Sequence, residues 1–130
     1  MKLFKLSLLF TICSAKGAQE LDGATFYGDV VDSVSKEVLG DRAWFIDLYS
    51  PWCKHCKALA PTWDELADKH EGSMNVVKVD CSKFANNNIC NMFGVSNLPT
   101  LVYLPVRSNE FHMYNGKGER KMNDLEYFAV

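Results

Sequence analysis

The chain has 130 residues, enough for one domain and too few for two of ordinary size. Its hydrophobic content of 48% and charged content of 23% are those of a globular protein that buries a core, which excludes a low-complexity chain. The formal net charge of −2 lacks the basic excess of nucleic-acid-binding proteins, so no nucleic acid is expected as a partner.

The first residues have the order of a secretory signal peptide. Two lysines precede an apolar run over residues 6–13, and small side chains follow it. The run is much shorter than the roughly 20 residues of a membrane span, so no stable membrane span is expected. We predict a signal peptide over residues 1–17, cleaved after Ala15 or Gly17, and one domain over residues 18–130; an amphipathic first helix is the alternative. Cleavage would remove Cys13 and leave four cysteines. An even number indicates disulfide pairing in an oxidising compartment, so we expect the protein in the endoplasmic reticulum lumen or outside the cell.

The first half of the domain predicts two helices around a buried strand. Four valines between positions 30 and 38 fall on one helical face, and Gly40 would end that helix. The apolar run Ala43–Tyr49 predicts a strand buried on both faces. A long helix follows, in which Pro61 removes one backbone hydrogen bond. Its core-facing side is lined by Leu59, Trp63, Leu66, Ala67 and His70.

The second half predicts three strands and two helices. In chain order they are a strand over Asn75–Val79, a helix over Phe84–Phe93 ended by Gly94, strands over Thr100–Leu104 and Glu110–Tyr114, and a helix that opens near Asn123. Strands alternate with helices and then two strands come together as antiparallel neighbours. This order predicts an α/β fold with a mixed central sheet.

A pair of cysteines lies at the start of the long helix. Cys53 and Cys56 are three residues apart, so in a first helical turn both face the same side and can form a disulfide with little backbone strain. The positive end of the helix dipole, with Lys54 and His55 beside it, favours the thiolate of Cys53. Such a pair exchanges disulfides: Cys53 forms a mixed disulfide with a substrate sulfur and Cys56 resolves it. The reaction needs no metal and no organic cofactor.

Two cysteines at this spacing can instead be half of a zinc site, which Cys81 and Cys90 would complete. No second C-x-x-C and no pair of histidines lies at ligand spacing. We therefore expect no bound metal.

The segment from Tyr49 to Lys57, YSPWCKHCK, resembles the active-site segment of the protein disulfide isomerase family within the thioredoxin superfamily. The likeness continues, in the family's order, through LAPTW at 59–63, KVDC at 78–81, FGV at 93–95 and LPT at 98–100. The resemblance implies a thioredoxin-like three-layer sandwich with a mixed central β-sheet flanked by helices. It also implies an active centre at Cys53 and Cys56.

The resemblance further implies a substrate loop. A cis peptide bond before Pro99 would hold Leu98, Pro99 and Thr100 against the cysteine pair. The backbone beside Pro99 could then hydrogen-bond an incoming substrate chain, next to Trp52.

Asp47 is the only acid in the apolar strand before the cysteines. Thioredoxins are similar in having an aspartate there, whereas disulfide isomerases more often have a glutamate. It would be a buried carboxylate with a raised pKa that moves protons to or from Cys56; an edge-strand carboxylate facing water is the alternative. The resemblance makes Lys78 its charge partner. It matches Arg120 to the mobile arginine that tunes the resolving cysteine, with a plain surface arginine as the alternative.

Cys81 and Cys90 match cysteines that several disulfide-isomerase-like domains pair, which implies a structural disulfide; two free buried thiols are the alternative. Their spacing also resembles the thioredoxin-like domain of quiescin-type sulfhydryl oxidases. Two residues depart from the isomerase pattern: Lys54 replaces the usual glycine between the cysteines, and Asn97 stands where isomerases commonly have glycine.

The sequence therefore predicts a thiol–disulfide oxidoreductase of the disulfide isomerase type. Its partners would be unfolded or misoxidised secretory proteins, together with an upstream oxidant or glutathione. One alternative is a thioredoxin-type reductase, against which His55 argues because such reductases typically have C-G-P-C. A second alternative is the thioredoxin-like domain of a sulfhydryl-oxidase-type protein. A third, which is not an enzyme, is a non-catalytic chaperone or recruiting module that uses the apolar surface around Trp52 and Leu98.

Overall fold

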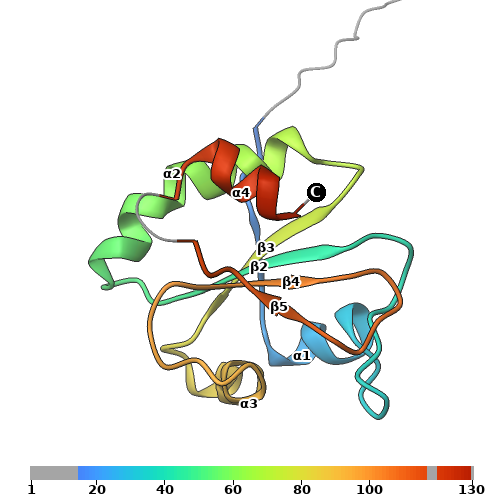
Figure 1. Ribbon diagram of the computed structural model, residues 1–130. Helices are drawn as coiled ribbons and strands as arrows, with labels where there is room; N and C mark the ends of the chain where they lie inside the picture. The colour runs from blue at the N-terminus through green and yellow to red at the C-terminus, as the bar shows by residue number, and fades with distance from the viewer. Residues whose placement is uncertain (1–14, 117–119, 130) are drawn as a thin grey trace, which may run out of the picture.

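The computed structural model describes residues 15–116 and 120–129. The strands are β1 (Gln19–Leu21), β2 (Trp44–Tyr49), β3 (Asn75–Asp80), β4 (Thr100–Leu104) and β5 (His112–Met113). The helices are α1 (Gly23–Thr25), α2 (Lys54–Lys69), α3 (Asn87–Met92) and α4 (Met122–Ala129). The sheet is the middle layer, with α2 and α4 over one face and α1 and α3 over the other (Figure 1). The predicted α/β sandwich with a mixed central sheet is confirmed.

The strand order in the sheet is β1-β3-β2-β4-β5. Strands β1, β3 and β2 are parallel, while β4 runs antiparallel to β2 and β5 antiparallel to β4. Because β2 and β3 are parallel neighbours, with Tyr49 in register with Asp80, they end at the same edge of the sheet. The N–H of Cys81 donates to the carbonyl of Tyr49 at 2.7 Å. The loops that lead to Cys53 and to Cys81 therefore begin side by side.

Two apolar cores cover the two faces of the sheet. The core under α2 and α4 contains Phe45, Trp63, Leu66 and Leu125, none more than 1% exposed. The indole N–H of Trp63 donates to the carbonyl of Val77 at 2.9 Å, which fixes α2 on the sheet. The opposite core is centred on Phe26, Val30, Ile46, Leu48, Val79, Ile89 and Phe93.

Side chains alternate between the two faces along each strand. Ile46 and Leu48 pack in the core on the α1 and α3 side, so Asp47 and Phe45 lie on the α2 side. Asp47 is therefore placed beneath the helix that begins at the cysteine pair.

The chain before β1 lies against α2. The backbone N–H groups of Lys16 and Gly17 donate to Asp68 Oδ1, and that of Ala18 donates to Asp64 Oδ1, each at 2.9 Å. The predicted signal peptide falls mostly on residues 1–14, outside the described residues, and it stays a prediction.

The helix predicted from the valines between positions 30 and 38 is wrong. Val31 forms an antiparallel bridge with Val38, and Val34 is 88% exposed. The carboxylate of Asp32 accepts the N–H groups of Val34 and Ser35 at 2.8 Å, which stabilises a turn in place of a helix. Lys36 lies at a φ of 64°, outside the helical region.

Two other elements differ in extent from the prediction. The segment from residue 84 to 93 is a 3₁₀ turn over Phe84–Asn86 followed by α3, and β5 is shorter than the predicted strand. Strand β1 was not predicted. Strands β2, β3 and β4 are observed within one residue of their expected limits, the long helix is observed as α2, and α4 begins one residue before Asn123.

Candidate active site

Cys53 is the N-cap residue of α2 and follows the end of β2 by four residues. Its sulfur accepts the N–H of Cys56 at 3.2 Å, so the thiol lies at the positive end of the helix. Both cysteines carry free thiols, with Cys53 half-buried and Cys56 4% exposed. The pair thus combines one sulfur that solvent can reach with one that is shielded.

The buried position of Cys56 disfavours its thiolate. Burial is the main cause that raises its pKa to about 12, and the Cys53 thiol and the Asp47 charge add to the effect. At neutral pH Cys56 therefore carries its proton, and a base beside it is needed before it can attack a disulfide.

The loop before β4 lies against Cys53. The Leu98–Pro99 peptide bond is cis, and the Cys53 thiol contacts the Leu98 carbonyl with 3.6 Å between sulfur and oxygen. The Thr100 hydroxyl donates to the carbonyl of Asn97, which closes the loop. Pro99 is buried, while Trp52, the residue before Cys53, is 74% exposed. The fold therefore brings the predicted substrate loop to the reactive sulfur.

Asp47 is buried in the central strand β2, 4% exposed, so it is not an edge-strand carboxylate facing water. Burial raises its pKa to about 7, although the charges of Lys78 and Arg120 act in the opposite direction. Its Oδ1 has no hydrogen-bond partner among the described residues. A cavity of about 40 Å³ lies between Asp47, Cys56, Trp63 and Lys78, which is room for a water molecule. Asp47 and Cys56 thus line the same small cavity.

The other predicted site residues lie at different places around the cavity and the cysteines. Lys78 lines the cavity. Arg120 is half-buried, its Nε is shielded without a hydrogen-bond partner among the described residues, and its charge lowers the pKa of Asp47. Lys54 and His55 are exposed on the first turn of α2.

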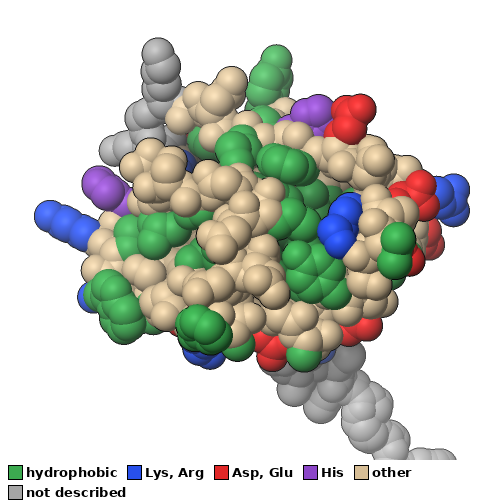
Figure 2. Space-filling view, turned by 90° about the horizontal axis from the view of Figure 1, so that it is seen from below, with side chains coloured by type: hydrophobic (Ala, Val, Ile, Leu, Met, Phe, Trp, Pro, Cys, Tyr) green, Lys and Arg blue, Asp and Glu red, His purple; other side chains and the backbone are tan. Residues whose placement is uncertain are grey.

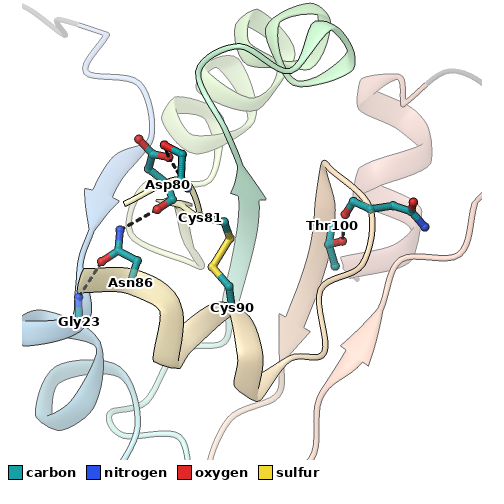
Figure 3. Close-up of a disulfide and its surroundings, with 8 residues drawn as sticks. Gly23, Asp80, Cys81, Asn86, Cys90 and Thr100 are labelled. Atoms are coloured by element: carbon teal, nitrogen blue, oxygen red, sulfur yellow. Dashed lines mark hydrogen bonds between the residues drawn. A yellow bond between two sulfur atoms is a disulfide. The ribbon is translucent and has the colours of Figure 1, made fainter. Parts of the chain in front are cut away.

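Cys81 and Cys90 form a disulfide with an S–S distance of 2.09 Å, at the end of β3 and within α3 (Figure 3). Beside it, the buried Asn86 donates to the carbonyl of Asp80 at 2.8 Å and accepts the N–H of Gly23 at 3.1 Å. The disulfide keeps these two sulfurs from joining Cys53 and Cys56 around a zinc ion. Within residues 15–116 and 120–129 no cluster of three metal-ligating side chains is found, and no helix is long and apolar enough to cross a membrane.

Sequence reasoning missed three residues around this site. Tyr49 and Asp64 line the cavity, and Glu20 accepts a hydrogen bond from the Tyr49 hydroxyl. Tyr49 lies inside the family-like segment and could have been singled out there. Glu20 is brought to the site by the pairing of β1 with β3, which no motif marks.

The thioredoxin family model matches residues 26–129. The chain belongs to the thioredoxin family. It is 40% identical over 84 residues to protein disulfide isomerase-like 2-1 of Oryza sativa subsp. japonica, covering 63% of this chain and 22% of the relative. It is 33% identical over 115 residues to probable protein disulfide-isomerase A6 of Medicago sativa, covering 87% of this chain and 29% of the relative.

Among solved structures, full-length ERdj5 is similar with a TM-score of 0.71 and 28% identity, over 86% of this chain and 16% of that one. The chain spans only 22% to 37% of the length of the first four curated relatives it matches, so the likeness concerns one domain of larger proteins. Together with the cysteine pair, these matches support thiol–disulfide oxidoreductase activity in this thioredoxin-family domain.

Proposed function

We propose that this thioredoxin-family domain forms and rearranges disulfides in secretory client proteins, through a mixed disulfide at Cys53 that Cys56 resolves. The observation that carries the proposal is the asymmetry of the pair. Cys53 is half-buried at the start of α2 beside the Leu98 carbonyl, while Cys56 lies buried next to Asp47.

In the oxidation of a client, a client thiolate attacks the Cys53 sulfur of the Cys53–Cys56 disulfide. The sulfur–sulfur bond breaks, a mixed disulfide forms at Cys53, and Cys56 leaves and takes a proton from Asp47. A second client thiolate then attacks the client sulfur of the mixed disulfide and releases the Cys53 thiolate. The client loses two electrons and gains a disulfide, while the domain becomes the dithiol.

In the reverse direction, the Cys53 thiolate attacks a client disulfide and a client thiolate leaves. Cys56 resolves the mixed disulfide after its proton has passed to Asp47, directly or through a water in the shared cavity. With a pKa raised to about 7 by burial, Asp47 is populated in both protonation states near neutral pH. It can therefore serve as the base in one direction and as the acid in the other.

The proposed location is the endoplasmic reticulum lumen or the cell exterior. The leader-like residues 1–17 and the relatives named as disulfide isomerases support it. The clients would be unfolded or misoxidised secretory proteins, and an upstream oxidant or glutathione would regenerate the disulfide.

Trapping the intermediate tests the mechanism. With a reduced client and the oxidant diamide, Cys56→Ser should accumulate a covalent adduct on non-reducing gels, because no second sulfur remains to resolve the mixed disulfide. Cys53→Ser should accumulate no such adduct, since Cys56 is buried. An adduct that forms more readily in Cys53→Ser would reverse the two roles, and full biological activity of Cys53→Ser would replace the proposal by a non-catalytic module.

The reduction potential separates an isomerase from a reductase. We expect a potential for the Cys53/Cys56 couple near the value of about −180 mV typical of disulfide isomerases, measured against glutathione buffers. A potential near the thioredoxin value of about −270 mV would make the domain a reductase.

A further inference from the structure

Three charged residues lie side by side across three strands. Glu20 in β1 is in register with Lys78 in β3, and Lys78 is in register with Asp47 in β2. Neighbouring strands are about 4.8 Å apart, so the stem of Lys78 has a carboxylate-bearing side chain on each side. Lys78 therefore has an acidic side chain on each of its two neighbouring strands, on the same face of the sheet.

Tyr49 connects Glu20 to the cavity. It lies two residues after Asp47 in β2, and so on the same face of the sheet. Its hydroxyl donates to the Glu20 carboxylate, and the Lys78 Nζ lies 5.8 Å from the centre of its ring. Tyr49 and Lys78 both line the cavity that Asp47 shares with Cys56. Glu20 lies outside this cavity but holds one of the side chains that form its wall.

We propose that Glu20 is a positioning residue for proton transfer between Asp47 and Cys56, because it shares the Lys78 ammonium with Asp47 and fixes Tyr49 at the wall of the cavity. The role in catalysis rests on the proposed function. The effect of Glu20 on Asp47 is a property of the folded domain alone.

Charged groups from β1, β3, α2 and the segment before α4 act on Asp47, while its neighbour in β4 is the apolar Leu101. Lys78 in β3 and Arg120 before α4 favour its ionised form, while Asp64 in α2 and Glu20 in β1 oppose it. Cys56, also in α2, is protonated at neutral pH and adds no charge there, because burial raises its pKa. Neutralising Glu20 removes one negative charge that opposes ionisation of Asp47. Asp47 then no longer competes with Glu20 for the positive charge of Lys78, so the pKa of Asp47 should fall.

Titration of the reduced protein tests this directly. The Asp47 side-chain carboxyl carbon is followed by NMR from pH 5 to pH 9 in the unchanged protein and in Glu20→Gln, whose amide oxygen can still accept the Tyr49 hydroxyl. We expect the pKa of Asp47 to fall by about 0.5 to 1 unit in Glu20→Gln. Glu65→Gln is the matched control, an exposed glutamate on α2, and should leave this pKa unchanged. Equal titration curves for Glu20→Gln and the unchanged protein would overturn the proposal.

A second background tests whether Glu20 acts through Lys78. In Lys78→Met the pKa of Asp47 should rise. Adding Glu20→Gln to this variant should lower the pKa of Asp47 by no more than half of the shift that Glu20→Gln causes when Lys78 is present. A shift of the same size in both backgrounds would show that Glu20 acts on Asp47 directly and would overturn the sharing of Lys78. Because the titration involves no client, failure of the mixed-disulfide experiment would leave this result standing.

Discussion

Two cysteine pairs begin at the same edge of the sheet and differ in bonding and in surroundings. The pair at Cys53 and Cys56 lies within the first turn of one helix, carries free thiols and lies next to a buried carboxylate. The pair at Cys81 and Cys90 is nine residues apart, forms a disulfide and joins the end of β3 to α3. A buried carboxylate, Asp80, also lies beside this pair, but it accepts the N–H and the hydroxyl of Ser82, whereas Asp47 Oδ1 has no hydrogen-bond partner among the described residues.

The difference matches what the proposed function requires of a cysteine pair besides two sulfurs. Cys53 and Cys56 are held near each other by the first turn of α2, and in the proposed mechanism Asp47 exchanges a proton with Cys56. Cys81 and Cys90 belong to separate elements, so their bond is a cross-link whose loss frees a segment of chain.

The largest effect is expected from the carboxylate beneath the first pair. Burial raises the pKa of Asp47 from 3.8 to about 7, so well below pH 3.8 its carboxyl is protonated in folded and unfolded chains alike and costs nothing. Between pH 4 and pH 7 the unfolded chain releases this proton while the folded chain keeps it, and stability falls. Above pH 7 the full penalty, on the order of 4 kcal/mol, is present.

Asp47→Asn removes this penalty. The difference in free energy of unfolding between Asp47→Asn and the unchanged protein should therefore be about 4 kcal/mol more favourable to the variant at pH 8 than at pH 4. Urea unfolding at both pH values measures the gain. Asp41→Asn, at an exposed position, is the control and should show no such dependence. A gain of equal size at both pH values would mean that the buried charge is not its cause. Asp47→Asn should also slow resolution of the mixed disulfide by Cys56.

Removing the second pair should lower stability and leave the chemistry intact. The double variant Cys81→Ala with Cys90→Ala opens a short loop and should reduce the free energy of unfolding by about 2–3 kcal/mol. Its rate of mixed-disulfide formation at Cys53, measured under native conditions, should stay within about twofold of that of the unchanged protein. Loss of exchange in a variant that is still folded would show that the two pairs are not separable.

The smallest effect is expected at Lys54. Its side chain is exposed on the first turn of α2, so salt screens its charge and Lys54→Gln should make the couple less oxidising by under about 30 mV. His55→Pro removes a side chain that can carry a positive charge and should shift the potential further in the same direction. Equilibration with glutathione measures both variants, and equal shifts would contradict this ranking.

The central strands could be predicted because their residues are buried on both faces. Strands β2, β3 and β4 read as apolar runs, and the structure has them within one residue of the expected limits. Strand β1 gave no such signal, since it has three residues and only Leu21 is buried. The valines between positions 30 and 38 repeat with a helical period by coincidence, and the local hydrogen bonds of Asp32 decide their conformation.

Some residues of the candidate site could be predicted from the sequence and others could not. Residues inside the family-like motifs, such as Trp52, Cys56 and Pro99, could be named from the sequence. Glu20 could not, because its place depends on the register between β1 and β3, and register is set by long-range pairing. The cavity beside Asp47 likewise results from packing between α2 and the sheet.

The two margins of the sheet bear on solubility. Strand β1 has three residues and presents the polar side chains of Gln19 and Glu20, and β5 at the opposite margin has two residues. Short, polar edge strands give another extended chain few backbone groups with which to pair. Without β1, by contrast, the N–H and C=O groups of β3 next to Val77 and Val79 would form an open edge and invite aggregation. A fragment that starts at Phe26, where the family match begins, would therefore be expected to self-associate.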